Sequence, residues 1–217
     1  MKNAVHCLGE RYIGCGHSGP DLILEGTPGN ALGAYLNGAS IRLYGNAQDA
    51  TGDTMNEGTI VIHGSTGDAV GYSMRGGAIY VRDNAGCRAG IHMKASADKV
   101  PVLVIGGSCG SFLGEYLAGG YLVVLGLNTQ GESPVGDFCG TGMHGGKIYL
   151  RTDVLPNDLP AQVVVSRATQ EDLAEIMPII ETYCGHFGAE KAEIMSRGFY
   201  VLTPNTKNPY KQLYCAN

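Results

Sequence analysis

The sequence predicts an all-β protein: a right-handed parallel β-helix of about seven coils with a C-terminal helical cap. Three observations predict this fold. A glycine-anchored unit of about 19 residues repeats along the chain, each copy holds one short alternating apolar run, and the repeat stops after Thr152. Glycine supplies 34 of the 217 residues, which suits a chain that turns sharply many times. A single-stranded solenoid that winds once per repeat accounts for all of this.

The repeat is clearest in two successive copies, residues 58–74 and 77–93, whose landmarks differ by 19 positions. Most copies contain a Gly-x-x-x-Gly pair with a large apolar residue three positions later. The second glycines are Gly33, Gly52, Gly71, Gly90, Gly114 and Gly140, and the apolar residues are Leu36, Met55, Met74, Met93, Leu117 and Met143. We expect the glycines to form one column at a corner that needs positive φ or close approach of the backbone. The apolar residues should form a buried ridge, with Met55, Met74 and Met93 in mutual contact.

Each copy also contains a period-two run, which is typical of a strand with one buried face. The inward positions are Leu22/Leu24, Ile41/Leu43, Ile60/Ile62, Ile79/Val81, Leu103/Ile105, Leu122/Val124 and Ile148/Leu150. A unit this short cannot hold a pair of helices, which excludes the helical solenoids. Two insertions interrupt the frame, at residues 94–101 and 127–134. We expect both to protrude as loops and one of them to contact a partner chain.

The chain is predicted to divide into a β-helix repeat domain, residues 1–153, and a C-terminal part, residues 154–217, made of a linker, a capping helix and an extended tail. Thr169 and Asp172 have the side chains of a helix N-terminus. Apolar residues follow at helical spacing up to Gly185, with Pro178 marking a kink or a second start. We expect this helix to cover one open end of the stack, and residues 201–210 to form a strap over the surface.

Composition excludes several classes of protein. The net charge is −5 and no window is strongly basic, which argues against nucleic-acid binding. No apolar run is long enough for a membrane span, and the N-terminus lacks the apolar stretch of a signal peptide. The seven cysteines include no Cys-x-x-Cys pair, so we expect reduced thiols in the cytoplasm rather than disulfides or structural zinc.

Two glycine motifs resemble catalytic or cofactor-binding signatures. Residues 14–19 fit the dinucleotide fingerprint, and residues 106–110 fit the nucleophile elbow. Both signatures require a helix to follow, whereas here an apolar strand follows the first and the repeat continues after the second. We therefore interpret both as corner turns and predict no cofactor-binding residue.

No catalytic or metal-binding residue is predicted among the cysteines and histidines. Position 2 is Lys2, so no N-terminal cysteine nucleophile is expected, and Cys7 and Cys15 are interpreted as buried small hydrophobes. Cluster or metal ligands should share a column of the repeat. The candidates fall in different columns: Cys87, Cys109 and Cys139 for an iron–sulfur cluster, and His63, His92 and His144 for a metal.

Acidic residues do share a column. Asp49 and Asp68 occupy the same position of successive copies, and Asp137 returns to it further on. Stacked carboxylates could hold a cation or act as acid and base on a sugar. Because Cys87 and Ser111 interrupt the column, we expect an exposed polar corner instead.

Four stretches connect the repeat with a known family: residues 11–16, 25–30, 45–55 and 71–77. Together they resemble the C-terminal glycine-repeat (GXGXG) domain of the large subunit of glutamate synthase, in its stand-alone form. A more distant resemblance is to the glycine-repeat subunit of formylmethanofuran dehydrogenase. The resemblance covers the chain from about residue 9 to the tail.

The resemblance implies a non-catalytic structural subunit that acts as spacer and scaffold between two partner chains. These would be a glutamine amidotransferase and a synthase that carries FMN and an iron–sulfur cluster, so this chain itself should hold no cofactor. Two alternatives stay open: a structural subunit of a formylmethanofuran-dehydrogenase-like complex, and an independent carbohydrate-active β-helix. Whether the chain also forms a homo-oligomer stays open too.

Overall fold

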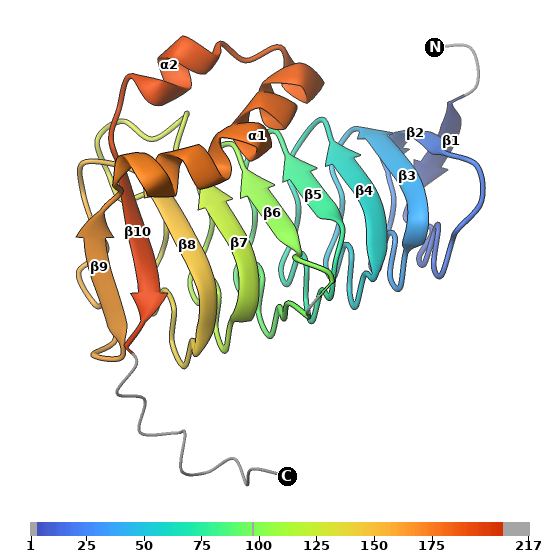
Figure 1. The fold of residues 1–217 in the computed structure, drawn as a ribbon. Coiled ribbons are helices and arrows are strands. Elements are labelled where there is room, and N and C mark those ends of the chain that lie inside the picture. The colour runs from blue at the N-terminus through green and yellow to red at the C-terminus, as the bar shows by residue number, and fades with distance from the viewer. Residues whose placement is uncertain (1–3, 97, 206–217) are drawn as a thin grey trace, which may run out of the picture.

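The computed structural model describes residues 4–96 and 98–205, and it confirms the predicted fold class. Ten strands form one sheet, which is the strand face of a β-solenoid (Figure 1). The solenoid has about six turns, close to the seven predicted. The strands are β1 (Val5–Leu8), β2 (Leu22–Thr27), β3 (Asn37–Tyr44), β4 (Glu57–Ile62), β5 (Ala78–Val81), β6 (Val102–Ile105), β7 (Ala118–Val124), β8 (Gly145–Arg151), β9 (Val163–Arg167) and β10 (Phe199–Pro204). Strands β1 to β8 pair in parallel, each with the next.

The strand register places equivalent residues of the repeat beside one another. Ile41 pairs with Ile60, Ile60 pairs with Ile79, and the same column continues through Leu103 and Leu122. These side chains are at most 1% exposed. The alternating runs therefore line the core, as the period-two pattern predicts.

The predicted methionine ridge is also buried. Met55, Met74 and Met93 are 0% exposed and belong to one hydrophobic cluster together with the strand residues. The core thus runs without interruption through the stack, because each coil buries its apolar face only against its neighbours.

The six predicted glycines form one column at a corner, with φ between 64° and 74°. Each donates its amide hydrogen to the previous coil, for example Gly52 to the carbonyl of Leu32 and Gly71 to that of Thr51, both at 2.8 Å. A second column, which contains Gly26 and Gly45, shows why small residues recur at another corner. A Cβ at Gly45 would collide with the carbonyl oxygen of Gly26.

The C-terminal helix is present, although it does not lie across the end of the stack. Helix α1 (Gln170–Phe187) runs along the outer face of the later strands, and the short α2 (Lys191–Met195) follows (Figure 1). Thr169 and Asp172 form the predicted capping box, Gly188 ends the helix in the left-handed conformation, and the helix continues through Pro178 without a second start.

Strands cover the end of the stack instead. β10 pairs antiparallel with β8, and β9 pairs antiparallel with β10. Residues 201–204 of the predicted strap therefore form part of strand β10. The side chains of Val201 and Leu202 are both buried there. Residues 206–210 lie outside the described residues.

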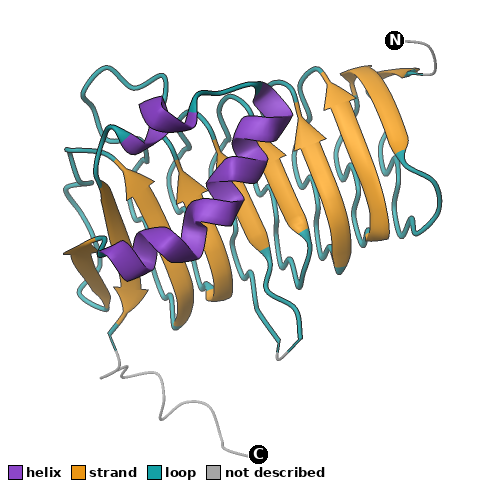
Figure 2. Ribbon diagram, turned by 45° about the horizontal axis from the view of Figure 1, so that its top comes forward, coloured by secondary structure: helices purple, strands orange, loops and turns teal. Residues whose placement is uncertain are grey.

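The two insertions form the connections β5–β6 and β7–β8. Figure 2 shows the β5–β6 loop extending beyond the neighbouring turns. Its Lys99 reaches back two coils to Glu57, with Nζ and Oε2 3.1 Å apart. In the other loop, Leu127 is 39% exposed and Asn128 donates to Asn84. The expected contact of a loop with a partner chain stays a prediction. Within the described residues, no helix is both long and apolar enough to cross a membrane.

Candidate functional site

Both glycine motifs lie at corners of the solenoid. After the first motif the chain enters β2, and after the second it enters the glycine corner of the next coil, where Gly114 has φ 64°. Neither motif is followed by a helix. The first therefore has no helix N-terminus to bind a phosphate, and the second has no strand-to-helix turn to expose a nucleophile. The predicted corner turns are confirmed.

The carboxylates of the acidic column accept hydrogen bonds from the backbone of the next coil. One carboxylate oxygen of Asp49 accepts from the amide of Asp68 at 2.9 Å, and one of Asp68 accepts from the amide of Cys87 at 2.8 Å. Further along the column, the Ser111 hydroxyl accepts from the amide of Asp137 at 3.2 Å. Cys87 and Ser111 thus separate Asp137 from the adjacent pair Asp49 and Asp68, and the column is the exposed polar corner that the sequence predicts.

The cysteines come from different columns, as predicted, yet three thiols lie near one another. Burial raises the pKa of Cys109 well above its usual value, and neighbouring Cys139 and Cys87 raise it further. Burial, followed by the nearby Asp158, raises the pKa of Cys139 to about 12. Burial therefore favours the protonated form of both thiols.

Cys7 is buried as expected, whereas the same expectation for Cys15 is wrong. Cys15 is exposed, in a turn between Gly14 and Gly16, which both have positive φ. Among the residues that the structure describes, no group of three or more histidine, cysteine or acidic side chains could hold a metal ion.

The three histidines separate into two environments. His63 stacks on Tyr44 with ring centroids 4.5 Å apart, and its ring meets the edge of Phe187 at the end of α1. Burial, then the charges of Arg42, Arg82 and His186, lower its pKa. His63 is therefore a neutral packing residue near neutral pH.

His92 and His144 line one open groove of about 390 Å³. Their positions in the repeat fall in different columns, and repeat spacing alone does not predict that both line one groove. The groove runs between two outward-facing columns on either side of the methionine ridge. Ser73, His92 and Tyr116 lie along one, with Tyr72 beside Ser73, and Arg75, Lys94 and His144 lie along the other. The signal that could have indicated it is the recurrence of a basic residue directly after Met74 and Met93.

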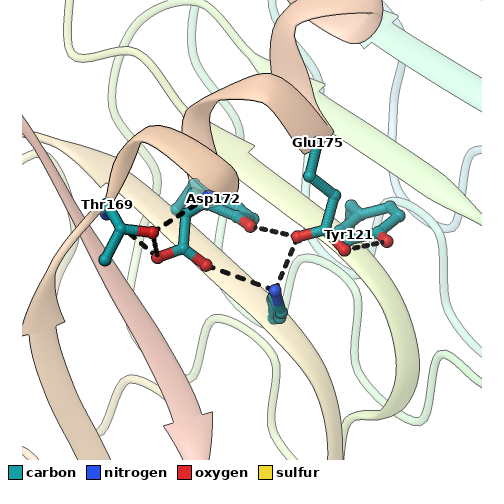
Figure 3. A network of polar contacts seen from close by, with 6 residues as sticks. Tyr121, Thr169, Asp172 and Glu175 are labelled. Carbon is teal, nitrogen blue, oxygen red and sulfur yellow. Dashed lines mark hydrogen bonds and ion pairs between the residues drawn. The ribbon is translucent and has the colours of Figure 1, made fainter.

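A polar cluster attaches helix α1 to the sheet (Figure 3). Glu175 accepts hydrogen bonds from Tyr121, Lys147 and Tyr149, each at 2.6 Å. Lys147 also contacts Asp172 at 3.3 Å. Burial raises the pKa of Glu175, but these hydrogen bonds outweigh it and the net shift is downward. All the charged members have partners within the cluster, which indicates a structural role. The cluster was not predicted from the sequence, because its members come from three distant elements.

A solenoid with internally bonded polar corners and open grooves on its outside defines a glycine-repeat β-solenoid domain. The chain belongs to the family described as GXGXG motif, whose sequence model matches residues 5–205. The resemblance to the glycine-repeat domain of glutamate synthase is thereby confirmed at the level of the family. The chain is also 44% identical to "Uncharacterized protein MJ1350" of Methanocaldococcus jannaschii over 222 aligned residues, which cover 99% of this chain and 84% of that protein.

Proposed function

We propose that this protein is a non-catalytic structural subunit of a glutamate-synthase-type complex. It would act as spacer and scaffold between a glutamine amidotransferase chain and a synthase chain that carries FMN and an iron–sulfur cluster. Membership of the GXGXG family supports this proposal. The observation that carries it is that Asp49 and Asp68, the stacked carboxylates of the acidic column, serve as acceptors for the backbone of the next coil.

The fold suits such a role. Hydrogen bonds join each coil to its neighbours along the strands and again along the glycine corner, so the position of each coil is set by the coil before it. A solenoid also offers long surfaces on which two partners can bind at separate places. In this proposal, the reaction and its cofactors belong to the partner chains.

The test is affinity purification of the tagged protein from cells that naturally make it, followed by mass spectrometry of the bound chains and a visible spectrum. We expect an amidotransferase chain and a flavin-bearing synthase chain, with flavin and iron–sulfur absorbance that is absent from the chain purified alone. Recovery without either chain would contradict the proposal.

Two other outcomes would support the alternatives. A molybdenum or tungsten pterin in the purified complex would indicate a formylmethanofuran-dehydrogenase-like assembly. Cleavage of a polysaccharide by the isolated chain, lost in Asp49→Asn or Asp68→Asn, would indicate an independent carbohydrate-active enzyme.

A further inference from the structure

The groove beside the methionine ridge follows directly from the repeat. Met74 and Met93 point into the core, so the residues that flank them point outward. The lining residues come from four successive coils, from Ser73 in the first to His144 in the last. At about 4.8 Å per coil the groove extends for about 14 Å, roughly the length of four residues of extended chain.

One side of the groove carries unpaired positive charge. Arg75 and Lys94 occupy the same position of adjacent coils, and neither forms an ion pair with any residue that the structure describes. No acidic side chain is among the described residues that line the groove. Like charges stacked in adjacent coils repel one another, and a bound anion would remove this repulsion.

Several other basic side chains of this protein are neutralised by an acidic side chain. Most of the ion pairs neutralise an arginine or lysine, namely Arg82, Arg88, Lys99, Lys147, Lys191 and Arg197. In a chain of net charge −5, an acidic partner at Arg75 or Lys94 would have been easy to supply. Arg11, Arg42, Arg151 and Arg167 also form no ion pair with the described residues, but they come from different columns, whereas Arg75 and Lys94 are stacked in adjacent coils.

The other side of the groove is aromatic and held in place. The ring of His92 stacks on Tyr116 with centroids 5.1 Å apart and planes 11° apart, and Tyr72 meets it edge-on at 6.0 Å. His92 and Tyr116 have φ of 55° and 52°, a conformation that costs energy for any residue except glycine. Tyr72 and Tyr116 are 38% and 44% exposed. Exposed, ordered tyrosines beside arginine are typical of protein interfaces.

We propose that this groove is the docking site for an acidic, extended segment of a partner protein. Its carboxylates would lie against Arg75 and Lys94, and its backbone and apolar atoms against the rings of Tyr72, His92 and Tyr116. The length of the groove and its open side favour a peptide over a small anion, which would leave most of the surface uncovered. This proposal rests on the proposed function only in requiring a partner chain.

The experiment uses a fluorescein-labelled hexaglutamate peptide as probe and measures its binding to the full-length protein by fluorescence anisotropy at low ionic strength. The variants are Arg75→Glu and Lys94→Glu. The control is Arg11→Glu, which makes the same charge change at an exposed arginine of the first coil. We expect each groove variant to bind about tenfold more weakly, and the control to stay within about twofold of the original protein.

Three results would overturn the proposal: no binding of hexaglutamate to the original protein, an equal loss in Arg11→Glu, or full competition by free glutamate at the same concentration. The last would mean a site for small anions. Thermal unfolding checks that the variants fold, and Arg75→Gln and Lys94→Gln replace them if they do not. A protein that binds hexaglutamate through Arg75 and Lys94 but copurifies with no synthase chain would refute the proposed function and leave the groove intact.

Discussion

Asp49 and Asp68 stand one coil apart, and a carboxylate oxygen of Asp49 accepts the backbone amide hydrogen of Asp68 at 2.9 Å. Asp68 repeats this contact with Cys87 at 2.8 Å. A parallel column is formed by Asn46, Ser65 and Asn84, whose side-chain oxygens accept from the backbone amides of Ser65, Asn84 and Ser108. At these corners the backbone turns, and some amide groups have no carbonyl oxygen of the previous coil in reach. Side-chain oxygens accept their hydrogen bonds and so continue the bonding between strands.

The first prediction concerns this corner. Asp68→Ala removes the acceptor for the Cys87 amide and should lower the free energy of unfolding by about 0.5–1.5 kcal/mol. Asp68→Asn keeps an acceptor oxygen and should change it by less than about 0.5 kcal/mol. Urea unfolding followed by circular dichroism measures both. Equal losses in the two variants would show that the negative charge, and not the hydrogen bond, is what matters.

The second prediction separates strain from collision in the glycine column. Gly52 and Gly71 both have φ of 69°, but an added Cβ collides with Ile79 Cδ1 at Gly52 and lies 3.5 Å from its nearest neighbour at Gly71. Gly71→Ala should cost about 1–2 kcal/mol, the strain of the left-handed backbone alone. Gly52→Ala should cost about 1 kcal/mol more than that, because Ile79 must move. Urea unfolding of the two variants measures the difference.

A double variant checks the cause of the difference. Ile79→Val removes the colliding methyl group and by itself should cost about 0.5–1.5 kcal/mol. In its presence, Gly52→Ala should cost no more than Gly71→Ala in the original protein. If the extra cost persists, the collision with Ile79 is not its source.

The third prediction concerns the methionine ridge. Met74 is fully buried, and Met74→Ala should lower the free energy of unfolding by about 2–5 kcal/mol, the range for large-to-small changes in a core. Gln130→Ala, at an exposed position of the β7–β8 loop, is the control and should stay within about 0.5 kcal/mol. A loss below that limit for Met74→Ala would mean that the ridge contributes little to the core.

Repeat periodicity explains which parts of this structure could be predicted from the sequence. A residue that recurs every coil, such as Gly52 or Met74, has neighbours that are fixed by the repeat itself, so its column and burial follow from spacing. The C-terminal elements have no such frame. The capping box at Thr169 indicates where α1 begins, but nothing in its sequence distinguishes the flank of the stack from its end.

The groove illustrates a different difficulty. Arg75 and Lys94 lie one repeat apart and were open to prediction from the spacing. His144 follows two insertions, so the number of residues that separates it from His92 hides the fact that both face one groove. The contacts of Glu175 with Tyr121 and Lys147 join residues 54 and 28 positions apart, and only the docked helix brings them together.

The fourth prediction is that acid releases helix α1 from the sheet before the solenoid unfolds. Backbone and side-chain hydrogen bonds from Thr169, with Lys147, lower the pKa of Asp172. The pKa of Glu175 is also lowered, as described above. A carboxyl with a lowered pKa in the folded state stabilises that state fully above its ordinary pKa. The stabilisation is then lost as the pH falls below about 4.5 and through the lowered value.

Hydrogen exchange followed by mass spectrometry measures this release segment by segment. Peptides from α1 should lose protection as the pH falls below the ordinary carboxyl range, after correction for intrinsic exchange rates, while peptides from β4 to β6 keep theirs. Glu175→Gln should weaken protection of α1 at neutral pH by about 1 kcal/mol, roughly fivefold in the opening equilibrium, because a neutral amide is a weaker acceptor for Lys147 and the two tyrosines. Glu171→Gln, an exposed position in the first turn of the same helix, is the matched control and should leave protection unchanged. Simultaneous loss of protection in α1 and in β4 to β6 would show that the helix is part of the cooperative unit of the solenoid and does not detach separately.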